Sequence, residues 1–256
     1  MAESRSYDDV LLPELAVRTG APKIVAFDSV GSTMDAAHEL AREGAAHGTL
    51  VLAGEQTAGR GRERREWQSP RGGVWLTLIA RGLNPCDLAA LPLRIGIATA
   101  EALDAFTKER ITLKWPNDLL LRAGKLGGVL VEARWRGEQL DWAGVGVGVN
   151  LAPPDHVGAA GLGSTVKRSA VVERLVPALL TATSRTGTLT GPELAAFASR
   201  DMARGREISS PLAGIAAGID ESGALLVESA GTITPVRSGS LVFRRFAAAL
   251  STDAKR

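Results

Sequence analysis

Apolar and polar positions follow two different periods along this chain. Apolar side chains recur at three- and four-residue spacing over residues 88–106, which predicts a helix. Similar stretches predict helices over residues 170–182 and 192–203, and small apolar residues predict another after the turn at residues 31–33. Short β-prone runs between turn residues predict strands at residues 24–28, 50–55, 74–79, 112–114, 119–121, 126–133 and 140–149.

The pattern changes after about residue 204. Short β-prone segments follow one another with glycine-containing turns between them, at residues 208, 215–219, 224–228, 232–236 and 241–245. Such a series is typical of a small all-β barrel. We therefore predict an α+β fold with two domains: residues 1–203 form a mixed or antiparallel sheet with flanking helices, and residues 204–256 form a small β-barrel.

Composition narrows the classes of function. The chain has 256 residues, of which 45% are hydrophobic, and this is enough to bury one sizeable core and a small second one. A formal net charge of +2 gives no general attraction to nucleic acid or membranes. The single cysteine, Cys86, excludes an internal disulfide framework, and neither a secretory signal nor a membrane-spanning apolar stretch is visible. We therefore expect a cytoplasmic protein.

Residues 56–73 are rich in glycine and arginine and have almost no apolar periodicity. Long loops of this kind in a compact domain are usually functional or disordered. Glycines let backbone N–H groups approach a phosphate, and guanidinium groups neutralise it through forked hydrogen bonds. On chemistry alone a solvated basic loop is an equally good interpretation, although Trp67 favours a ligand site because its indole ring needs burial.

Lys114 is a second candidate, because it ends a predicted strand and precedes a stiff Trp-Pro corner. A lysine fixed in this way holds a positive charge where a reacting phosphate would develop negative charge. In isolation, a surface lysine beside a structural corner is favoured by roughly two to one. Likewise, Ser32 and Thr33 either cap a helix or offer hydroxyls to a ligand, and Asn150 either ends a strand or presents its amide to a base.

Taken together and in this order, four segments resemble the motifs of the bacterial biotin protein ligases. The resemblance runs from about residue 27 to residue 151, and more weakly over the C-terminal β segments. The matching segments are Gly-Ser-Thr-Met at residues 31–34, Gln-x-x-Gly-Arg-Gly-Arg at residues 56–62, Lys-Trp-Pro-Asn-Asp at residues 114–118, and Lys-Leu-Gly-Gly-Val-Leu-Val-Glu at residues 125–132. Met34 stands where the family often has Asn, and Arg64 where it commonly has Gly.

The resemblance implies a class II synthetase-like catalytic domain followed by an SH3-like barrel, and it assigns roles to residues. Biotin would be bound by Ser32, Thr33, Met34, Gln56, Arg60, Gly61, Arg62, Lys114, Gly127 and Gly128. ATP would be bound by Arg62, Arg65, Trp67, Lys114, Asn117, Lys125 and Asn150. Lys114, Arg60 and Arg62 would act in catalysis, and Trp75 or Leu130 would form a wall of the biotin slot.

The implied activity is that of a ligase with two steps. The biotin carboxylate attacks the α-phosphate of ATP, and a carrier lysine then attacks the resulting biotinyl-adenylate. Magnesium would accompany the ATP, held by phosphates and water, so we expect no protein metal site, and the three histidines show no metal spacing. We expect the arginine-rich loop to be mobile without ligand and to order over the adenylate.

The implied partner is the biotin carboxyl carrier protein domain of a biotin-dependent carboxylase, such as acetyl-CoA carboxylase. A homodimer is compatible with the sequence. The residues before the first catalytic strand are too few for a helix-turn-helix domain, so we expect no nucleic-acid binding.

Two alternatives stay open. A lipoate or octanoate ligase of the same superfamily would more typically have Arg-Arg-x-Ser-Gly-Gly-Gly in place of residues 59–65. A non-catalytic nucleotide-binding or carrier-binding module is the other alternative, and the presence of both Lys114 and the arginine loop argues against it.

Overall fold

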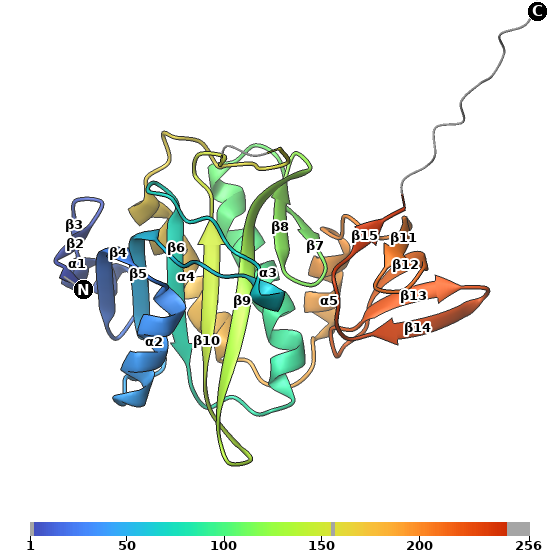
Figure 1. Cartoon of the computed structure of the whole chain (residues 1–256), viewed down its shortest axis with the longest axis horizontal. Helices are drawn as coiled ribbons and strands as arrows, with labels where there is room; N and C mark the ends of the chain where they lie inside the picture. Colours follow the sequence, from blue (N-terminus) through green and yellow to red (C-terminus); the bar gives the residue numbers. More distant parts are fainter. Residues whose placement is uncertain (1–2, 155–156, 245–256) are drawn as a thin grey trace, which may run out of the picture.

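A computed structural model describes residues 3–154 and 157–244. Its centre is an eight-stranded sheet in the order β1-β4-β5-β6-β10-β9-β8-β7 (Figure 1). The strands are β1 (Glu3–Ser4), β4 (Ile24–Val30), β5 (Leu50–Gln56), β6 (Val74–Ala80), β7 (Thr112–Lys114), β8 (Asp118–Leu121), β9 (Gly124–Arg136) and β10 (Gln139–Val149). Within this described sheet β4 and β5 are parallel and the other neighbours are antiparallel, which confirms the predicted mixed sheet.

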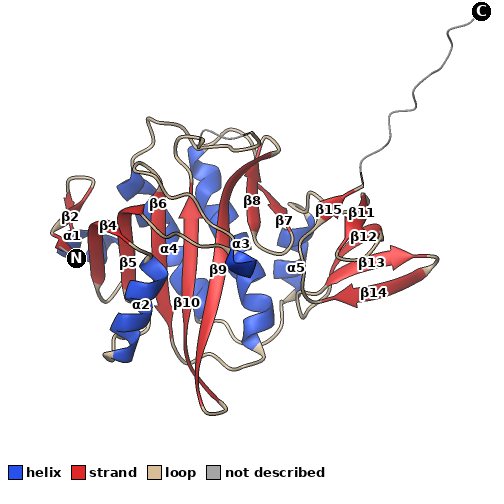
Figure 2. Cartoon of the chain, viewed as in Figure 1, coloured by secondary structure: helices blue, strands red, loops and turns tan. Residues whose placement is uncertain are grey.

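Helices cover the two faces of the sheet unequally (Figure 2). One face carries α1 (Leu12–Thr19), α3 (Asp87–Leu103) and α4 (Arg168–Thr183), and the other carries α2 (Thr33–Arg42). Side chains of β5 point alternately to the two faces of the sheet. Leu50 and Leu52 pack in the large core, whereas Val51 and Ala53 pack in a smaller core with α2. The face that carries α2 is therefore only partly covered by a helix.

Most predicted elements are present, with two errors at helices. The predicted helix over residues 192–203 is wrong at its end, because α5 (Gly191–Ala198) stops five residues earlier. The chain leaves the helix there to pair with β7: the Leu113 N–H donates to the Arg200 carbonyl at 2.8 Å, and Leu113 also bridges Asp201. Helix α1 was not predicted, nor was the small hairpin of β2 (Ser6–Tyr7) and β3 (Val10–Leu11) before it.

The segment between β5 and β6 crosses the open part of the α2 face, in front of β10 and β9 (Figure 1). It contains a 3-10 turn, η1 (Arg62–Arg64), and a second such turn, η2 (Asp104–Phe106), extends α3. The start of the crossing segment is fixed by backbone hydrogen bonds from Thr57 to the carbonyl of Val30 (2.9 Å) and from Ala58 to that of Gly31 (2.8 Å). A pocket lies between this segment and the sheet.

The C-terminal part is a five-stranded antiparallel sheet in the order β14-β13-β12-β11-β15. Its strands are β11 (Glu207–Ser210), β12 (Gly214–Ile219), β13 (Leu225–Ser229), β14 (Thr232–Val236) and β15 (Val242–Phe243). This confirms a small β domain, although its described strands form an open order and not a closed barrel. Residues 245–256 of the predicted domain lie outside the described residues, and the boundary at residues 203 and 204 stays a prediction.

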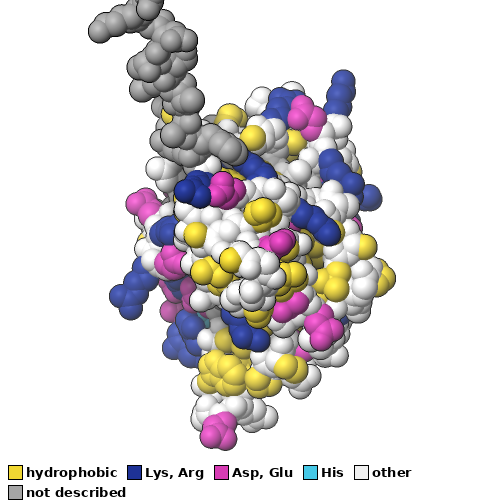
Figure 3. Space-filling view, turned by 90° about the vertical axis from the view of Figure 1, so that its right-hand side faces the viewer, with side chains coloured by type: hydrophobic (Ala, Val, Ile, Leu, Met, Phe, Trp, Pro, Cys, Tyr) yellow, Lys and Arg dark blue, Asp and Glu magenta, His cyan; other side chains and the backbone are white. Residues whose placement is uncertain are grey.

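The small sheet lies beside β7 and α5, at the end of the large sheet (Figure 1). The Trp115 indole N–H donates to the Gly223 carbonyl at 3.0 Å, which connects the corner after β7 to the small sheet. On the outward face of this part, apolar side chains are interspersed with charged ones (Figure 3). None of the helices in the described residues is long and apolar enough to span a membrane.

Candidate active site

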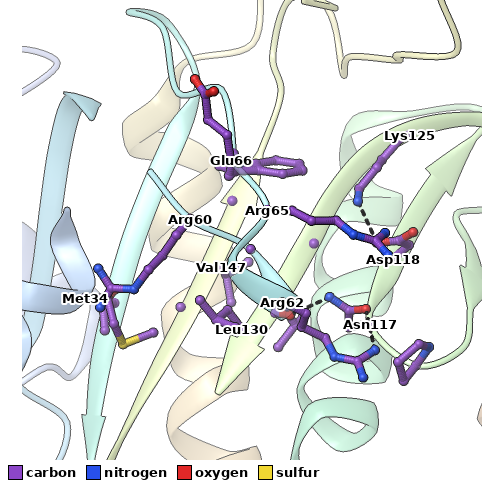
Figure 4. A pocket seen from close by; sticks show the side chains of 18 of the residues that line it. Met34, Arg60, Arg62, Arg65, Glu66, Asn117, Asp118, Lys125, Leu130 and Val147 are labelled. Atoms are coloured by element: carbon purple, nitrogen blue, oxygen red, sulfur yellow. Dashed lines mark hydrogen bonds and ion pairs between the residues drawn. The ribbon is translucent and has the colours of Figure 1, made fainter. Parts of the chain in front are cut away.

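A pocket of about 180 Å³ opens on the α2 face of the sheet, under the arginine-rich segment (Figure 4). Its walls come from the N-terminus of α2, the loop after β5, the corner after β7 and the turn before β15. The candidates that line it are Ser32, Thr33, Met34, Gln56, Arg60, Gly61, Arg62, Arg65, Trp67, Lys114, Asn117, Lys125 and Gly128. The structure therefore brings together all the predicted ligand-binding residues except Gly127 and Asn150.

One end of the pocket carries hydroxyl and amide groups. Ser32 is the N-cap of α2, and its Oγ accepts a hydrogen bond from the backbone N–H two residues later at 3.2 Å. The backbone N–H and Oγ1 of Thr33 both donate to Gln56 Oε1, at 2.8 and 3.0 Å, and its Oγ1 lies 2.9 Å from Thr77 Oγ1. Gln56 Nε2 in turn donates to Ser69 Oγ at 2.7 Å. Ser32 therefore caps the helix and also lines the pocket, so its two possible roles do not exclude each other.

The glycine run of β10 leaves room for this pocket. A Cβ atom on Gly144 would lie 2.4 Å from Met34 Sδ, and one on Gly148 would lie 2.7 Å from Trp67 Nε1. A Cβ atom on Gly146 would lie 3.0 Å from Met34 Cε. Apolar side chains also line the pocket, among them Leu76 and Val129, and Leu130 and Val147 lie between its two ends (Figure 4). The alternating glycines therefore accommodate side chains over the sheet and do not form a phosphate loop.

Arg60 is held by carboxylates from two elements. Its Nη1 and Nη2 donate to Asp35 at the start of α2, at 2.8 and 2.7 Å, and its Nε and Nη2 donate to Glu132 of β9, at 2.8 and 3.2 Å. The hydrogen bonds that Arg60 donates to Asp35 and Glu132 raise its pKa further above the ordinary value. The neighbouring His38 and Arg60 hold the pKa of Glu132 well below its ordinary value. The guanidinium group of Arg60 is therefore engaged by protein acids at the α2 side of the pocket.

The opposite end of the pocket is cationic (Figure 4). Arg62 Nη1 lies 3.5 Å from Asn117 Oδ1 and donates to the Gly239 carbonyl at 3.2 Å. Arg65 Nη2 donates to Glu63 at 2.7 Å and to Ser240 Oγ at 3.1 Å. Both arginines thus bridge the loop and the C-terminal part, and the pocket is bounded by the large sheet and by the turn before β15.

Two lysines add to this charge and differ in their surroundings. Lys125 Nζ lies 2.7 Å from Asp118 Oδ1 and 5.1 Å from the centre of the Trp67 ring. Lys114 is half-buried with its Nζ 5.9 Å from the centre of the Phe243 ring, and it belongs to none of the ion pairs found between described residues. The charge of Lys114 is therefore available to an anionic ligand, whereas that of Lys125 is partly balanced.

A second cavity of about 290 Å³ adjoins the pocket and is lined by Glu66, Trp67, Gln68, Lys125, Asn150 and Pro154. Asn150 lies here, with its Nδ2 donating to the Lys125 carbonyl at 3.3 Å, and not in the main pocket. The indole N–H of Trp67 is buried without a hydrogen-bond partner among the described residues. Glu66, Trp67 and Lys125 line both spaces, so the two cavities are neighbours.

Some predicted positions are corrected. Gly127 does not line the pocket, because it packs against β10, where a Cβ atom would lie 2.5 Å from the Gly148 carbonyl oxygen. Trp75 is no pocket wall: it is buried in the smaller core and donates to the Pro70 carbonyl at 2.9 Å. Leu130 does line the pocket. The expected mobility of the loop stays a prediction.

The sequence interpretation missed three groups of residues. Ser240 and Leu241 reach the pocket from the C-terminal part, and only the fold places them there. Thr77 of β6 adds a hydroxyl group beside Thr33. The alternation of side chains along a predicted strand does not show which of them line a pocket. Asp35 and Glu132 were not assigned a role, although Glu132 ends the last of the four motifs. The described residues contain no cluster of three or more His, Cys, Asp or Glu side chains arranged to hold a metal ion.

Comparison with known proteins agrees with this architecture. The model of the biotin/lipoate A/B protein ligase family matches residues 26–150. The chain is 30% identical over 234 residues to the bifunctional ligase/repressor BirA of Bacillus spizizenii, covering 84% of this chain and 72% of that protein. It is 33% identical over 201 residues to the biotin--[acetyl-CoA-carboxylase] ligase of Paracoccus denitrificans, covering 69% of this chain and 82% of that one.

Among solved structures, the biotin protein ligase of Aquifex aeolicus in complex with biotin and ATP superposes with a TM-score of 0.69 at 26% identity. The match covers 88% of this chain and 99% of the Aquifex protein. The fold and the site define a ligase-type small-molecule activating domain with a small β domain attached. The chain belongs to the biotin/lipoate A/B protein ligase family.

Proposed function

We propose that this chain is a biotin protein ligase, which activates biotin with ATP to biotinyl-5′-AMP and transfers the biotinyl group to a lysine of a biotin carboxyl carrier protein. The observation that carries this proposal is the polarity of the pocket under the arginine-rich segment. A hydroxyl and amide end is separated from a cationic end by an apolar stretch. Biotin has the same order of groups: a polar ureido ring, an apolar chain and a carboxylate.

At the first end, Ser32, Thr33 and Gln56 would accept from and donate to the ureido group. Gln56 already takes two donors on its Oε1 and gives one hydrogen bond from its Nε2, so its amide orientation is fixed before a ligand arrives. Leu130 and the backbone beside Gly146 would contact the apolar ring and chain. Preorganised polar groups of this kind bind without a further ordering cost.

At the second end, Lys114 would contact the biotin carboxylate and the α-phosphate of ATP. The carboxylate oxygen attacks phosphorus, an oxygen–phosphorus bond forms, and pyrophosphate leaves with the electron pair of the broken bond. Arg62, Arg65 and Lys125 would neutralise the phosphates, since a dry cationic site stabilises the charge that develops in this step. The adenosine part would extend toward Asn150 in the adjacent cavity, past Trp67.

Magnesium would enter with the ATP, and Asp118 and Glu66 are the carboxylates that line the pocket near its cationic end. Asp118 is engaged by Lys125 at 2.7 Å, which fits a metal held chiefly by phosphates and water. The second step is attack of a carrier lysine amine on the acyl carbon of the adenylate, which releases AMP. The acceptor would be the carrier domain of a biotin-dependent carboxylase in the cytoplasm, and a homodimer is compatible with this function.

The test is transfer of labelled biotin. The purified chain is incubated with labelled biotin, ATP and magnesium, with and without a biotin carboxyl carrier domain, and pyrophosphate release is measured in parallel. We expect label on the carrier, and we expect Lys114→Ala to lower adenylate formation by about 10²-fold or more, as for loss of one charge-stabilising group. Lys108→Ala is the matched control, because Lys108 is exposed and lies outside the pocket.

The outcomes separate the candidate functions. Label on the carrier that excess lipoate does not reduce supports the biotin ligase. Turnover of lipoate or octanoate in place of biotin would identify the sister activity of the same family. If neither adenylate nor pyrophosphate forms with any of these acids, the chain is not an enzyme of this kind, and a binding module is favoured.

A further inference from the structure

Arg60 differs from the other arginines of the loop in what it contacts. Arg62 and Arg65 reach toward the cationic end and the C-terminal part. Arg60 instead spans α2 and β9, with its Nη1, Nη2 and Nε donors all directed to Asp35 and Glu132. Its side chain is 29% exposed, so this two-acid arrangement is only partly screened by water. Of the three loop arginines that line the pocket, Arg60 is therefore the one held by carboxylates of both α2 and β9.

The contacts of Arg60 continue into the protein interior through Glu132. His38 Nε2 lies 3.4 Å from Glu132 Oε2, and His38 Nδ1 accepts a hydrogen bond from the Trp142 indole N–H at 3.0 Å. Because Nδ1 accepts, a neutral imidazole carries its proton on Nε2; this buried atom lies near Glu132 but makes no hydrogen bond among the described residues. Trp142 is held on its other side by Arg81, whose Cζ lies 5.2 Å from the ring centre. A continuous set of contacts thus leads from the loop to β10.

The backbone at the same place forms the pocket wall. Arg60 is bridged to Glu66 across the loop, Gly61 N–H donates to the Arg65 carbonyl at 2.8 Å, and Trp67 N–H donates to that of Gly59 at 2.9 Å. Arg60 and Gly61 both line the pocket. Holding the Arg60 side chain therefore fixes the position of the backbone that faces the ligand.

We propose that Asp35 and Glu132, supported by His38 and Trp142, are positioning residues. They act through Arg60 to hold the pocket wall on the α2 side in place for the carboxylic-acid substrate before ATP binds. This inference rests on the proposed function for the identity of the acid. The segment held in this way is residues 59–61, whose backbone is also bonded to residues 65–67. Of these four supporting residues, Asp35 and Glu132 accept hydrogen bonds from the Arg60 side chain. Neither of the two is a catalytic residue.

The test compares Glu132→Gln with Glu55→Gln. Glu55 is the matched control, because its carboxylate also holds a loop arginine, Arg71, at 3.2 Å, but outside the pocket. In the ligand-free protein we expect Glu132→Gln to speed tryptic cleavage after Arg60 several-fold. We also expect the KM for biotin to rise about tenfold, which corresponds to ~1.4 kcal/mol, with the KM for ATP unchanged. Glu55→Gln should change neither quantity.

A second pair of variants keeps the test informative if Glu132→Gln folds poorly. Asp35 is 60% exposed, so Asp35→Asn leaves the core intact and should give the same selective change, whereas Asp35→Glu keeps the charge and should restore most of the wild-type behaviour. Unchanged cleavage after Arg60, or equal increases in both KM values, would overturn the proposal. If the wild-type protein does not use biotin, the proposed function fails, and the cleavage rate alone still decides whether Arg60 is anchored.

Discussion

At the scale of single residues, Arg64 shows how a backbone conformation limits the choice of side chain. Its φ is +58°, in the left-handed region, and Glu63 before it has a φ of +57°. This region costs an L-residue roughly 1–2 kcal/mol and costs glycine little. The positive φ of this position is a physical reason for glycine to be favoured there.

The prediction is that Arg64→Gly is tolerated and Arg64→Val is not. Glycine removes the steric cost of the turn but adds entropy to the unfolded chain, so we expect the free energy of unfolding to stay within about 1 kcal/mol of wild type. Valine is a poor fit to positive φ and should cost about 1–2 kcal/mol. Urea unfolding measures both. Arg71 is not among the positive-φ residues, so there the valine variant should be more stable than the glycine variant. If glycine were the more stable variant at both sites, the argument from φ would be contradicted.

Site residues were predictable where they belong to a short motif that can be recognised in the sequence, and unpredictable where only a contact across the fold brings them to the site. The motif positions, among them Gln56, Lys114 and Lys125, line the pocket as a group. The anchor of Arg60 was missed because Glu132 is 72 positions away in the sequence, and spacing carries no signal for such a pair. Asn150 was placed correctly at the end of β10 but faces the adjacent cavity.

At the scale of elements, β10 and α2 are matched in shape. Gly144 and Gly146 face Met34, and their missing Cβ atoms make room for its thioether. We predict that Gly144→Ala destabilises the protein by about 1–3 kcal/mol, because its Cβ would lie 2.4 Å from Met34 Sδ. Met34→Ala should remove most of that cost, so that the double variant is less destabilised than the sum of the two single ones. A double-mutant cycle from urea unfolding measures this coupling.

The control for this cycle is Gly137→Ala with Met34→Ala. Gly137 lies in the turn between β9 and β10, and nothing is within 4 Å of a Cβ atom there, so any cost arises from its φ of +61° alone. We expect additive effects for this pair. Additivity for Gly144 and Met34 as well would mean that the glycine run is needed for another reason than the packing of α2.

Elements were predicted best where one periodicity dominates over many residues. The helix α3 and strands β6 and β10 agree with their predicted ranges within one or two residues, apart from the 3-10 extension of α3. Helix α5 was predicted too long because residues 199–203 still look helical, whereas their backbone is used to pair with β7. A contact of this kind between distant segments overrides local propensity.

At the scale of the whole molecule, the two sheets form one functional unit. The pocket takes Ser240 and Leu241 from the C-terminal part, and Arg62 and Arg65 are bound by the same turn. Phe243 lies between Lys114 and Arg206, at 5.9 and 3.7 Å from their charged groups. The C-terminal part therefore sets the positions of charges in the candidate active site, and the elements that hold the two parts together matter for function.

One such connection is the buried ion pair of Arg94 and Glu193, with side chains 2% and 5% exposed. Arg94 of α3 donates to Glu193 of α5 at 2.7 Å and to backbone carbonyls between α4 and α5, and α5 packs beside the small sheet. Burial alone raises the pKa of Glu193, but the hydrogen bonds from Arg94 and Thr190 more than offset it and lower the pKa to about 2. Glu193 is thus ionised in the folded protein at any pH above that value.

We predict that Glu193→Gln destabilises the protein by about 3–5 kcal/mol at pH 7, because it leaves a buried guanidinium without its anion. The pKa of Glu193 is depressed on folding, so its contribution is complete above the ordinary value of 4.5 and is lost as the pH falls through about 2. The difference between variant and wild type should therefore narrow between these two pH values, as measured by urea unfolding at a series of pH values. Glu109→Gln, which breaks an exposed pair with Arg122, should cost less than about 1 kcal/mol at pH 7. A difference for Glu193→Gln that stays constant down to pH 2 would show that the ionised pair does not hold α3 and α5 together.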